Sequence, residues 1–431
     1  MLPECHQPPG RKLNFHKPIL LLGCISYCTP IRRICARSSS FICKEEISHA
    51  GLQWAGDCCI IFTNVKGANP MSLSDLRALS NRYGGNPDYV LGGGGNTSFK
   101  EKGILYVKAS GQRLSDMTEA GFVAMEVEKL RAIAAREYAG TDKEVEAAVL
   151  ADMMAARLPG EDKRPSVEAA VHAMMEGAYV LHIHPNLLNG ITCARQGEVT
   201  LKVMLQGLAL WIPEIKPGYT LAHKAAADLA KFKEEHGVPC QIMFLQNHGV
   251  FFTADTVEEI DRLTAALFGA FGRFSPILPS AEPISQTSPL AETLSALSDD
   301  KTVLFEASDL LTAGLEADYF EKLPTFTPDH MVYCGHKFLL TTPERLAADY
   351  SAFAASEGFA PKVVGVKGVG AFAIGESDYK AGLILALLKD AIKIALYAEG
   401  SGGPRFQSSF LVNFIRNWEV ETYRAGAISD K

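Results

Sequence analysis

The chain of 431 residues is long enough for two or three domains with sizeable cores. Hydrophobic residues make up 47% of it and charged residues 21%, which is typical of a globular protein and excludes a disordered, collagen-like or membrane-embedded chain. The net charge of -7 excludes a globally basic surface for nucleic acid.

The ten cysteines are unevenly distributed, which argues against a disulfide or metal framework. Seven of them lie within the first 59 residues, and only Cys193, Cys240 and Cys334 follow. Such sparing use of cysteine over most of the chain is typical of reduced cytosolic proteins, so we expect a cytoplasmic protein.

Residues 1–70 form an atypical N-terminal extension. Eight Lys and Arg accompany four acids there, and the apolar run Pro18–Ile25 is much shorter than a membrane span. A transit or signal peptide is one interpretation. We favour a second one, in which translation starts at Met71, because Met71 and Ser72 open a well-patterned helix with a serine cap.

From residue 71 onward, apolar residues recur at helical or strand spacing. The predicted helices before residue 274 are Leu73–Tyr83, Glu119–Ala135, Lys143–Arg157, one that starts at Pro165 and Ser166, Tyr219–His236 and Val257–Phe271. The predicted strands there are Ile104–Lys108, Ala178–His184 and Gln241–Gln246, and a glycine-rich turn is predicted at 92–98.

The Ser- and Pro-rich stretch at 274–290 predicts a linker. We therefore expect a larger domain at 71–273 and a smaller C-terminal α/β accessory domain at 291–431. No internal repeat is evident from the sequence. The elements predicted in the second domain are strands at Met331–Thr341 and Lys362–Lys367, a turn at Gly368–Ala373 and a long amphipathic helix at Ser377–Glu399.

His182 and His184 lie at the end of a predicted apolar strand, where alternate side chains point to the same face. Two imidazoles at this spacing can bind one metal ion. His248 follows another apolar strand, and three histidines with an open fourth position are typical of a catalytic zinc site. Packing and turn roles are the alternative for each histidine taken separately. A cupin is excluded, because no glutamate stands at position 188 or 189.

Glu168 lies in the first turn of the helix that begins at Pro165 and Ser166, just before the strand that carries the two histidines. A carboxylate beside a metal site can serve as a general acid or base. The alternative is an ordinary early-turn acid that complements the helix dipole. His172 follows on the same helical face, and we interpret it as a packing or supporting residue rather than a ligand.

Residues 92–98 combine backbone amides of four glycines with the polar side chains of Asn96, Thr97 and Ser98, which suits an anion. Lys108–Gly111 adds a cation, the Ser110 hydroxyl and a glycine turn. The spacing matches neither a dinucleotide-binding fingerprint nor a P-loop. Ordinary loops remain the alternative for both segments.

These motifs together resemble the class II aldolase/adducin family. Within it, the chain is most similar to the aldolase portion of bifunctional rhamnulose-1-phosphate aldolase/alcohol dehydrogenase proteins. The resemblance is strong over 71–273 and looser in the second domain, around Val332–Cys334 and Asn417–Arg424. The motifs that carry it occur in the order Gly94–Ser98, Lys108–Gly111, Pro165–Glu168, His182–Pro185 and Asn247–Gly249.

The resemblance implies a three-layer α/β/α fold around a mainly antiparallel sheet, with Zn²⁺ or another divalent metal held by His182, His184 and His248. It implies an aldehyde-lyase that cleaves a ketose 1-phosphate, such as rhamnulose 1-phosphate, to dihydroxyacetone phosphate and an aldehyde through a metal-stabilised enediolate. Glu168 matches the catalytic acid/base. The predicted substrate- and phosphate-binding residues are Asn96, Thr97, Ser98, Lys108, Ser110, Gly111 and Ser166.

Family members form tetramers, so we expect a homo-oligomer whose partner is a phosphorylated sugar, without nucleic acid or membrane. Val167 departs from the pattern, because simpler aldolases of the family carry a second phosphate-binding serine there. The chain also ends shortly after Arg424, so we expect no dehydrogenase activity. A sugar-phosphate 4-epimerase and a non-catalytic adducin-like module are the alternatives. Glu168 favours the aldolase over the epimerases, which tend to carry aspartate there.

Overall fold

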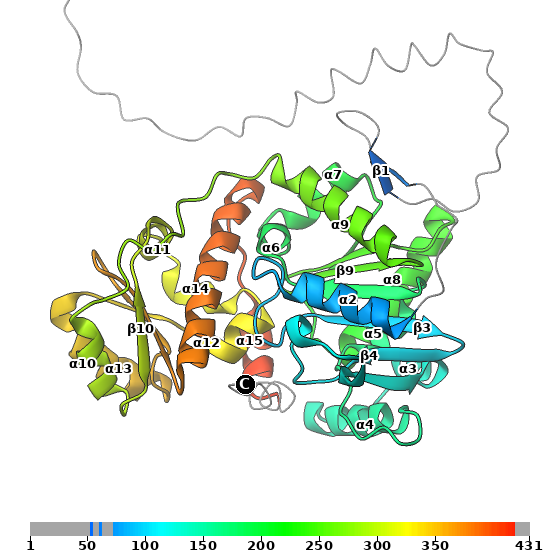
Figure 1. Ribbon diagram of the computed structural model, residues 1–431, viewed down its shortest axis with the longest axis horizontal. Helices are drawn as coiled ribbons and strands as arrows, with labels where there is room; N and C mark the ends of the chain where they lie inside the picture. Colours follow the sequence, from blue (N-terminus) through cyan, green and yellow to red (C-terminus); the bar gives the residue numbers. More distant parts are fainter. Residues whose placement is uncertain (1–51, 55–59, 63–71, 419–431) are drawn as a thin grey trace, which may run out of the picture. The chain divides into compact units, whose positions relative to one another are not determined.

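The computed structural model describes residues 52–54, 60–62 and 72–418, all of which belong to one unit that begins at His49 (Figure 1). Most of the predicted N-terminal extension lies outside these residues, as does the end of the chain from 419. Within the extension, strands β1 (Leu52–Trp54) and β2 (Ile60–Phe62) pair antiparallel. No helix in the described ranges is long and apolar enough to cross a membrane.

A seven-stranded sheet forms the first part of the unit, with strand order β5-β4-β3-β6-β9-β8-β7. Neighbouring strands are antiparallel except β7 and β8, which are parallel. The predicted mainly antiparallel sheet is therefore confirmed. The strands are β3 (Asn96–Glu101), β4 (Ile104–Lys108), β5 (Phe122–Glu126), β6 (Tyr179–Ile183), β7 (Leu210–Ile212), β8 (Ile242–Leu245) and β9 (Gly249–Ala254).

Helices cover both faces of this sheet, because alternate strand residues enter two separate cores. In β6, Leu181 and Ile183 pack into one core, and Val180 packs into the other. The first core contains residues of α2 (Leu73–Gly84), α6 (Asn186–Thr192), α7 (Gly197–Leu205) and α9 (Val257–Gly272). The second contains residues of α3 (Val127–Ala135), α4 (Asp142–Ala155), α5 (Ala169–Met174) and α8 (Tyr219–His236). This is the predicted three-layer α/β/α arrangement.

A smaller α/β unit follows, as the sequence predicts, and we call residues 290–418 the C-terminal unit. Its strands are β10 (Thr302–Glu306), β11 (Leu339–Thr341), β12 (Val363–Val366) and β13 (Gly370–Gly375). Its helices are α10 (Leu290–Leu297), α11 (Asp309–Leu315), α12 (Pro328–Cys334), α13 (Leu346–Glu357), α14 (Asp378–Ala398) and α15 (Ser409–Arg416). Short 3-10 helices lie at Leu114–Asp116, Glu119–Gly121, Phe320–Thr325, Pro343–Arg345 and Glu399–Ser401.

The smaller sheet repeats the topology of one half of the larger sheet, although the sequence shows no repeat. The order β10-β13-β12-β11 corresponds to β6-β9-β8-β7. In both runs the first two pairings are antiparallel and the last is parallel. Each run ends in a long helix, α9 or α14, whose N-cap is Thr256 or Ser377.

The two hairpins of this repeat correspond residue by residue. The β8–β9 hairpin closes with the pair Leu245 and Gly249, and the β12–β13 hairpin closes with Val366 and Gly370. The residue two places after the first member has a left-handed backbone in both, with φ of 54° and 73°. His248 in the first hairpin therefore corresponds to Val369 in the second. The repeat is hidden in the sequence because only the backbone pattern is retained.

Three of the predicted local structures are wrong. Glu119–Ala135 is not one helix, because the apolar run Phe122–Glu126 pairs with β4 as a strand before α3 begins. Met331–Thr341 is not one strand, because α12 continues to Cys334 after Pro328, which favours the first position of a helix. Gly368–Ala373 is only partly a turn, because β13 begins at Gly370.

The glycine-rich turn ends earlier than predicted, since β3 begins at Asn96. The predicted linker at 274–290 contains no helix or strand before Leu290, but Ser285 forms an isolated bridge with Ala307. The predicted domain boundaries themselves stay a prediction.

Helix α14 joins the two parts of the unit. It packs against β10, β13 and α12 on the C-terminal side and against α6 on the other, and Figure 1 shows it in orange between these elements. The contact with α6 requires a glycine, because a Cβ atom on Gly190 would lie 2.3 Å from the Cβ atom of Tyr397.

We expect Gly190→Ala to lower the free energy of unfolding by about 1–3 kcal/mol, because the added methyl group forces α6 and α14 apart. Gly269→Ala in α9 is the matched control, since no described atom lies within 4 Å of its Cβ position. The control should be neutral or stabilising by up to about 1 kcal/mol, as expected for alanine in a helix. Chemical denaturation measures both, and equal stabilities of the two variants would contradict the close α6–α14 contact.

Candidate metal centre

Three histidines meet at one end of the larger sheet. His182 is in β6 and its ring stacks on Phe251 of β9, with the ring centroids 4.0 Å apart. His184 follows two residues later, and the Nε2 atoms of the two rings are 2.9 Å apart. His248 lies in the turn between β8 and β9. One ligand atom from each of the three lies within 4.8 Å of the others, so the group has the geometry of a metal site.

The hydrogen bonds of the first two rings fix their tautomers. His182 Nδ1 lies 3.1 Å from the carbonyl oxygen of Val250, which can only accept, so this nitrogen carries the proton. His184 Nδ1 bonds in the same way to the carboxylate of Asp329. Both Nε2 atoms therefore turn lone pairs toward the same point, as metal ligation requires.

The turn that carries His248 has an unusual backbone conformation at Asn247, and hydrogen bonds from the Asn247 side chain hold it. Asn247 has a left-handed backbone with φ of 54°. Its Nδ2 donates to the carbonyl oxygens of Phe326, at 3.1 Å, and Arg405, at 2.8 Å. The next residue must be a glycine, because a Cβ atom on Gly249 would lie 2.5 Å from Cδ2 of His184. The sequence Asn-His-Gly thus brings the third imidazole against the other two.

Burial keeps His182 and His248 neutral. It lowers the pKa of His182 well below its ordinary value and the pKa of His248 to about 3. A neutral imidazole is the form that binds a metal, so the site requires no deprotonation near neutral pH before a metal can bind.

Glu168 lies opposite the histidines, at the N-cap of α5. The helix begins at Ala169 and not at Pro165 and Ser166, so Glu168 precedes it instead of lying in its first turn as predicted. Its Oε2 accepts a hydrogen bond of 2.7 Å from Nδ2 of Asn96 and lies 3.5 Å from Nε2 of His182. Its Oε1 is 3.6 Å from Nε2 of His248 and, among the described residues, has no hydrogen-bond partner although it is buried. A buried carboxylate oxygen without a partner is costly, so its direction toward the imidazoles indicates a ligand or a substrate proton.

Together these features fit a divalent metal ion. Converging imidazole lone pairs and an unpartnered carboxylate oxygen would repel one another without a cation or proton between them. Three nitrogen ligands suit zinc and several other divalent ions, so the donor set defines the kind of site and not the metal.

His172 supports Glu168 through Asn96, in line with its predicted role. Its Nε2 bonds to Oδ1 of Asn96, which must accept because the amide nitrogen donates to Glu168. His172 Nδ1 then accepts from the hydroxyl of Ser98 at 2.7 Å. The chain Ser98, His172, Asn96 and Glu168 is buried throughout, and burial lowers the pKa of His172 well below its usual value.

The predicted phosphate-binding residues fall into two groups. Asn96 and Ser98 have the internal partners described above, Thr97 Oγ1 lies 2.6 Å from Oγ of Ser80, and Lys108 Nζ donates to carbonyl oxygens of Gly93 and Gln112. The other three residues lie on two adjacent loops. Ser110 N donates to the carbonyl oxygen of Arg164 at 2.8 Å, and Ser166 N donates to that of Lys108 at 3.0 Å. Gly111 follows with φ of 81°. The roles of all seven stay predictions.

Sequence reasoning missed the residues of α12 that reach this region. Asp329 contacts His184, and the hydroxyl of Tyr333 accepts a 3.0 Å hydrogen bond from the backbone N–H of Gly93. Both lie more than 140 positions along the chain from their partners. No local pattern connects such distant positions.

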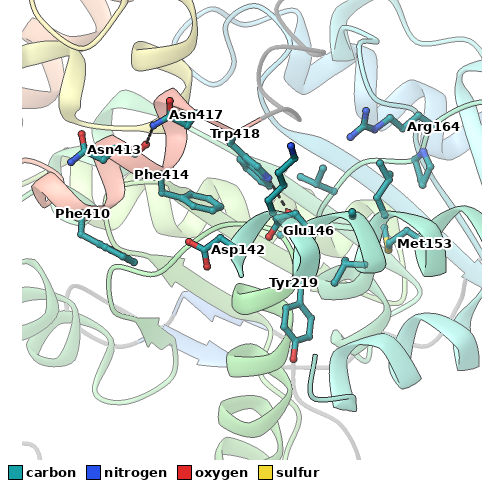
Figure 2. Close-up of a pocket in the computed structure, with 17 residues that line it drawn as sticks. Asp142, Glu146, Met153, Arg164, Tyr219, Phe410, Asn413, Phe414, Asn417 and Trp418 are labelled. Carbon is teal, nitrogen blue, oxygen red and sulfur yellow. Dashed lines mark hydrogen bonds between the residues drawn. The ribbon is translucent and has the colours of Figure 1, made fainter. Parts of the chain in front are cut away.

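A cavity of about 820 Å³ lies beside the loop before α5 (Figure 2). Pro165 and Val167 line it, together with Phe414 and Trp418 near the end of the described chain. Trp418 Nε1 donates a 2.9 Å hydrogen bond to Glu146, and both residues line this cavity. Neither the three histidines nor Glu168 line it. The cavities that do contain His184 or His248 hold about 10 Å³ each, which is room for roughly one water molecule.

Comparison with known proteins agrees with this geometry. Residues 75–268 match the family described as the class II aldolase and adducin N-terminal domain. An uncharacterized oxidoreductase, YuxG, of Bacillus subtilis (strain 168) is 25% identical over 207 residues, which are 46% of this chain and 29% of that protein. The chain thus spans less than a third of the length of this relative.

Two solved structures resemble the chain over about half of its length. The N-terminal class II aldolase domain of a conserved protein from Thermoplasma acidophilum is 24% identical, with 49% of this chain and 96% of that chain covered and a TM-score of 0.42. L-fuculose-1-phosphate aldolase from Thermus thermophilus is 14% identical, with 47% and 94% covered and a TM-score of 0.30.

The part of the chain built on the seven-stranded sheet is therefore a class II aldolase/adducin domain. More particularly, it is one that contains a group of three histidines, two of them buried, that could hold a metal ion.

We expect the purified protein to bind about one divalent metal ion per chain. His182→Ala and His248→Ala should each abolish this binding, because two imidazoles alone hold a metal weakly. His223→Ala is the matched control, since His223 of α8 bonds to the carbonyl oxygen of Ala134 and lies outside the group. Metal analysis after dialysis measures the stoichiometry, and full metal content in either site variant would contradict the three-histidine centre.

Proposed function

We propose that the protein is a metal-dependent aldehyde-lyase that cleaves a ketose 1-phosphate, such as rhamnulose 1-phosphate, to dihydroxyacetone phosphate and an aldehyde. One observation carries this proposal: a buried carboxylate with an unpartnered oxygen faces three convergent imidazoles inside a class II aldolase/adducin domain. Such an arrangement suits reactions that move a proton next to a stabilised negative charge.

His182, His184 and His248 would hold the metal, for which Zn²⁺ or another divalent ion is suitable. When bound, the metal supplies a Lewis acid that stabilises negative charge on the substrate's oxygens. His182 and His184 bring fixed tautomers to this task, and the sheet and its turn position all three rings.

Glu168 would transfer the proton. Cleavage of the bond between the third and fourth carbons of the ketose turns the hydroxyl on the fourth carbon into the aldehyde carbonyl, so this hydroxyl gives up its proton. The electron pair of the broken bond stays on the third carbon, which becomes part of dihydroxyacetone phosphate and must take up a proton. Asn96 holds one carboxylate oxygen of Glu168 and leaves the other directed at the imidazoles. The hydrogen bonds that connect Ser98, His172 and Asn96 thus orient the acid/base group.

The phosphate group would bind at the adjacent loops of Ser110, Gly111 and Ser166. Support for this comes from the first two residues, since Ser110 and Gly111 are partly open while Ser98 and Lys108 are buried with internal partners. Ser166 is buried on the adjacent loop, and its hydroxyl accepts a 3.3 Å hydrogen bond from the N–H of Glu168. Asn96, Thr97, Ser98 and Lys108 would then act mainly by shaping the site. Val167 faces the neighbouring cavity, so the missing second serine is consistent with a phosphate held by fewer hydroxyl groups.

A sugar-phosphate 4-epimerase would use the same metal site. A non-catalytic adducin-like module would need no metal site. Products separate the first alternative from the aldolase, because an epimerase releases no triose phosphate. The buried and convergent ligand set argues against the second alternative. We further propose a cytoplasmic homo-oligomer, a tetramer by resemblance.

We expect the metal-loaded protein to release dihydroxyacetone phosphate from at least one ketose 1-phosphate, with full loss of activity in EDTA. Glu168→Gln should retain the metal but lower kcat by about 10²–10⁴-fold, because it removes proton transfer alone. A coupled assay for triose phosphate measures the rate. Substrate conversion without triose phosphate, or an unchanged rate in Glu168→Gln, would overturn the proposed reaction.

Ser110→Ala and Ser166→Ala should raise KM for the phosphorylated ketose several-fold, because each removes a hydroxyl group from the proposed phosphate site. Thr97→Val serves as the control, since the Thr97 hydroxyl bonds to Ser80 inside the protein. This control should leave KM unchanged and lower the melting temperature instead. A larger rise in KM in the control than in the serine variants would place the phosphate elsewhere.

A further inference from the structure

We propose that the C-terminal unit completes the metal centre, with Asp329 of α12 as the positioning residue of His184. This inference deepens the proposed function, because it concerns the same metal site, but its evidence lies in the contacts of the protein alone.

Asp329 contacts a metal-ligand candidate directly. Its Oδ2 accepts a hydrogen bond from Nδ1 of His184, and both side chains are buried. A carboxylate in this position fixes the tautomer and the orientation of the ring and makes the opposite nitrogen a stronger ligand. Asp329 lies in the first turn of a helix that the class II aldolase/adducin match at 75–268 does not include.

The glycine-rich turn before β3 makes this contact possible. A Cβ atom on Gly94 would lie 2.3 Å from Oδ2 of Asp329, so any larger residue would displace the carboxylate. The N–H of Gly93 donates to the hydroxyl of Tyr333, one turn further along α12. In this structure the turn that the sequence suggests as an anion cradle therefore receives a helix of the C-terminal unit.

The C-terminal unit supports a second histidine as well. The side chain of Asn247, directly before His248, donates to the carbonyl oxygens of Phe326 and Arg405. Two of the three imidazoles thus depend on residues that follow residue 290. The remaining one, His182, is positioned by β6 and by Val250 within the larger sheet.

A separate group of polar side chains on and beside α12 offers a control. His330 Nδ1 lies 2.7 Å from Oγ1 of Thr327, and its Nε2 lies 3.3 Å from Oδ2 of Asp390 in α14. Asp390 also accepts from Asn186 at 3.2 Å. Asp390 is buried like Asp329 and supports the same helix, but it contacts none of the three metal-ligand candidates.

The test compares Asp329→Asn and Asp329→Ala with Asp390→Asn in the full chain. Zn²⁺ affinity is measured by competition with a chelating dye, and the visible spectrum is recorded with Co²⁺ in place of Zn²⁺. We expect both Asp329 variants to bind Zn²⁺ about 10–100-fold more weakly and to change the Co²⁺ spectrum, because the ring of His184 loses its carboxylate partner. Asp390→Asn should lower the melting temperature but leave both metal readouts as in the wild type.

Asp329→Asn keeps the size of the side chain, so it remains informative if Asp329→Ala fails to fold. Wild-type affinity and spectrum in Asp329→Asn would overturn the proposal, and so would an equal loss of affinity in Asp390→Asn, which would indicate general loosening of the site. Neither readout uses a substrate. A protein that binds metal through Asp329 but cleaves no ketose 1-phosphate would refute the proposed function and leave this inference standing.

Discussion

The gathering of three imidazoles and one carboxylate in a single, largely buried cluster is the constraint on which the surrounding structure depends. Each buried polar atom without a partner costs about 1–3 kcal/mol, so the neighbouring elements must supply partners from several directions. Val250 of β9 accepts a hydrogen bond from His182, and Asp329 of α12 accepts one from His184. Asn96 of β3 donates one to Glu168. The ring nitrogens and the carboxylate oxygen that are left over face one another.

The ligand set could be predicted from sequence because its geometry is local. Alternation along one strand places His182 and His184 on the same face, and the Asn-His-Gly turn ends the neighbouring strand. Asp329 could not be predicted, since its contact with His184 arises only when elements from distant parts of the chain pack together. Thr97 shows that a polar residue in such a motif can have an internal partner, since its hydroxyl bonds to Ser80, and its predicted binding role stays a prediction.

The fold was predictable to a similar degree. Long helices such as α8 and α9 follow from their apolar period. The structure of short apolar runs could not be predicted in this way, because a stretch such as Phe122–Glu126 satisfies a helical pattern and becomes a strand only through pairing with β4. The resemblance to a known family supplied the layers and the antiparallel sheet, which no single element revealed.

The repeated topology has a consequence for how the domain holds together. In the second copy, Phe305 pairs with Phe372 where His182 pairs with Phe251 in the first, and Val369 stands in place of His248. The same arrangement of strands and closing helix therefore forms from apolar side chains, with no imidazole at either position. The strand arrangement of this half-sheet therefore does not require imidazoles at these two positions.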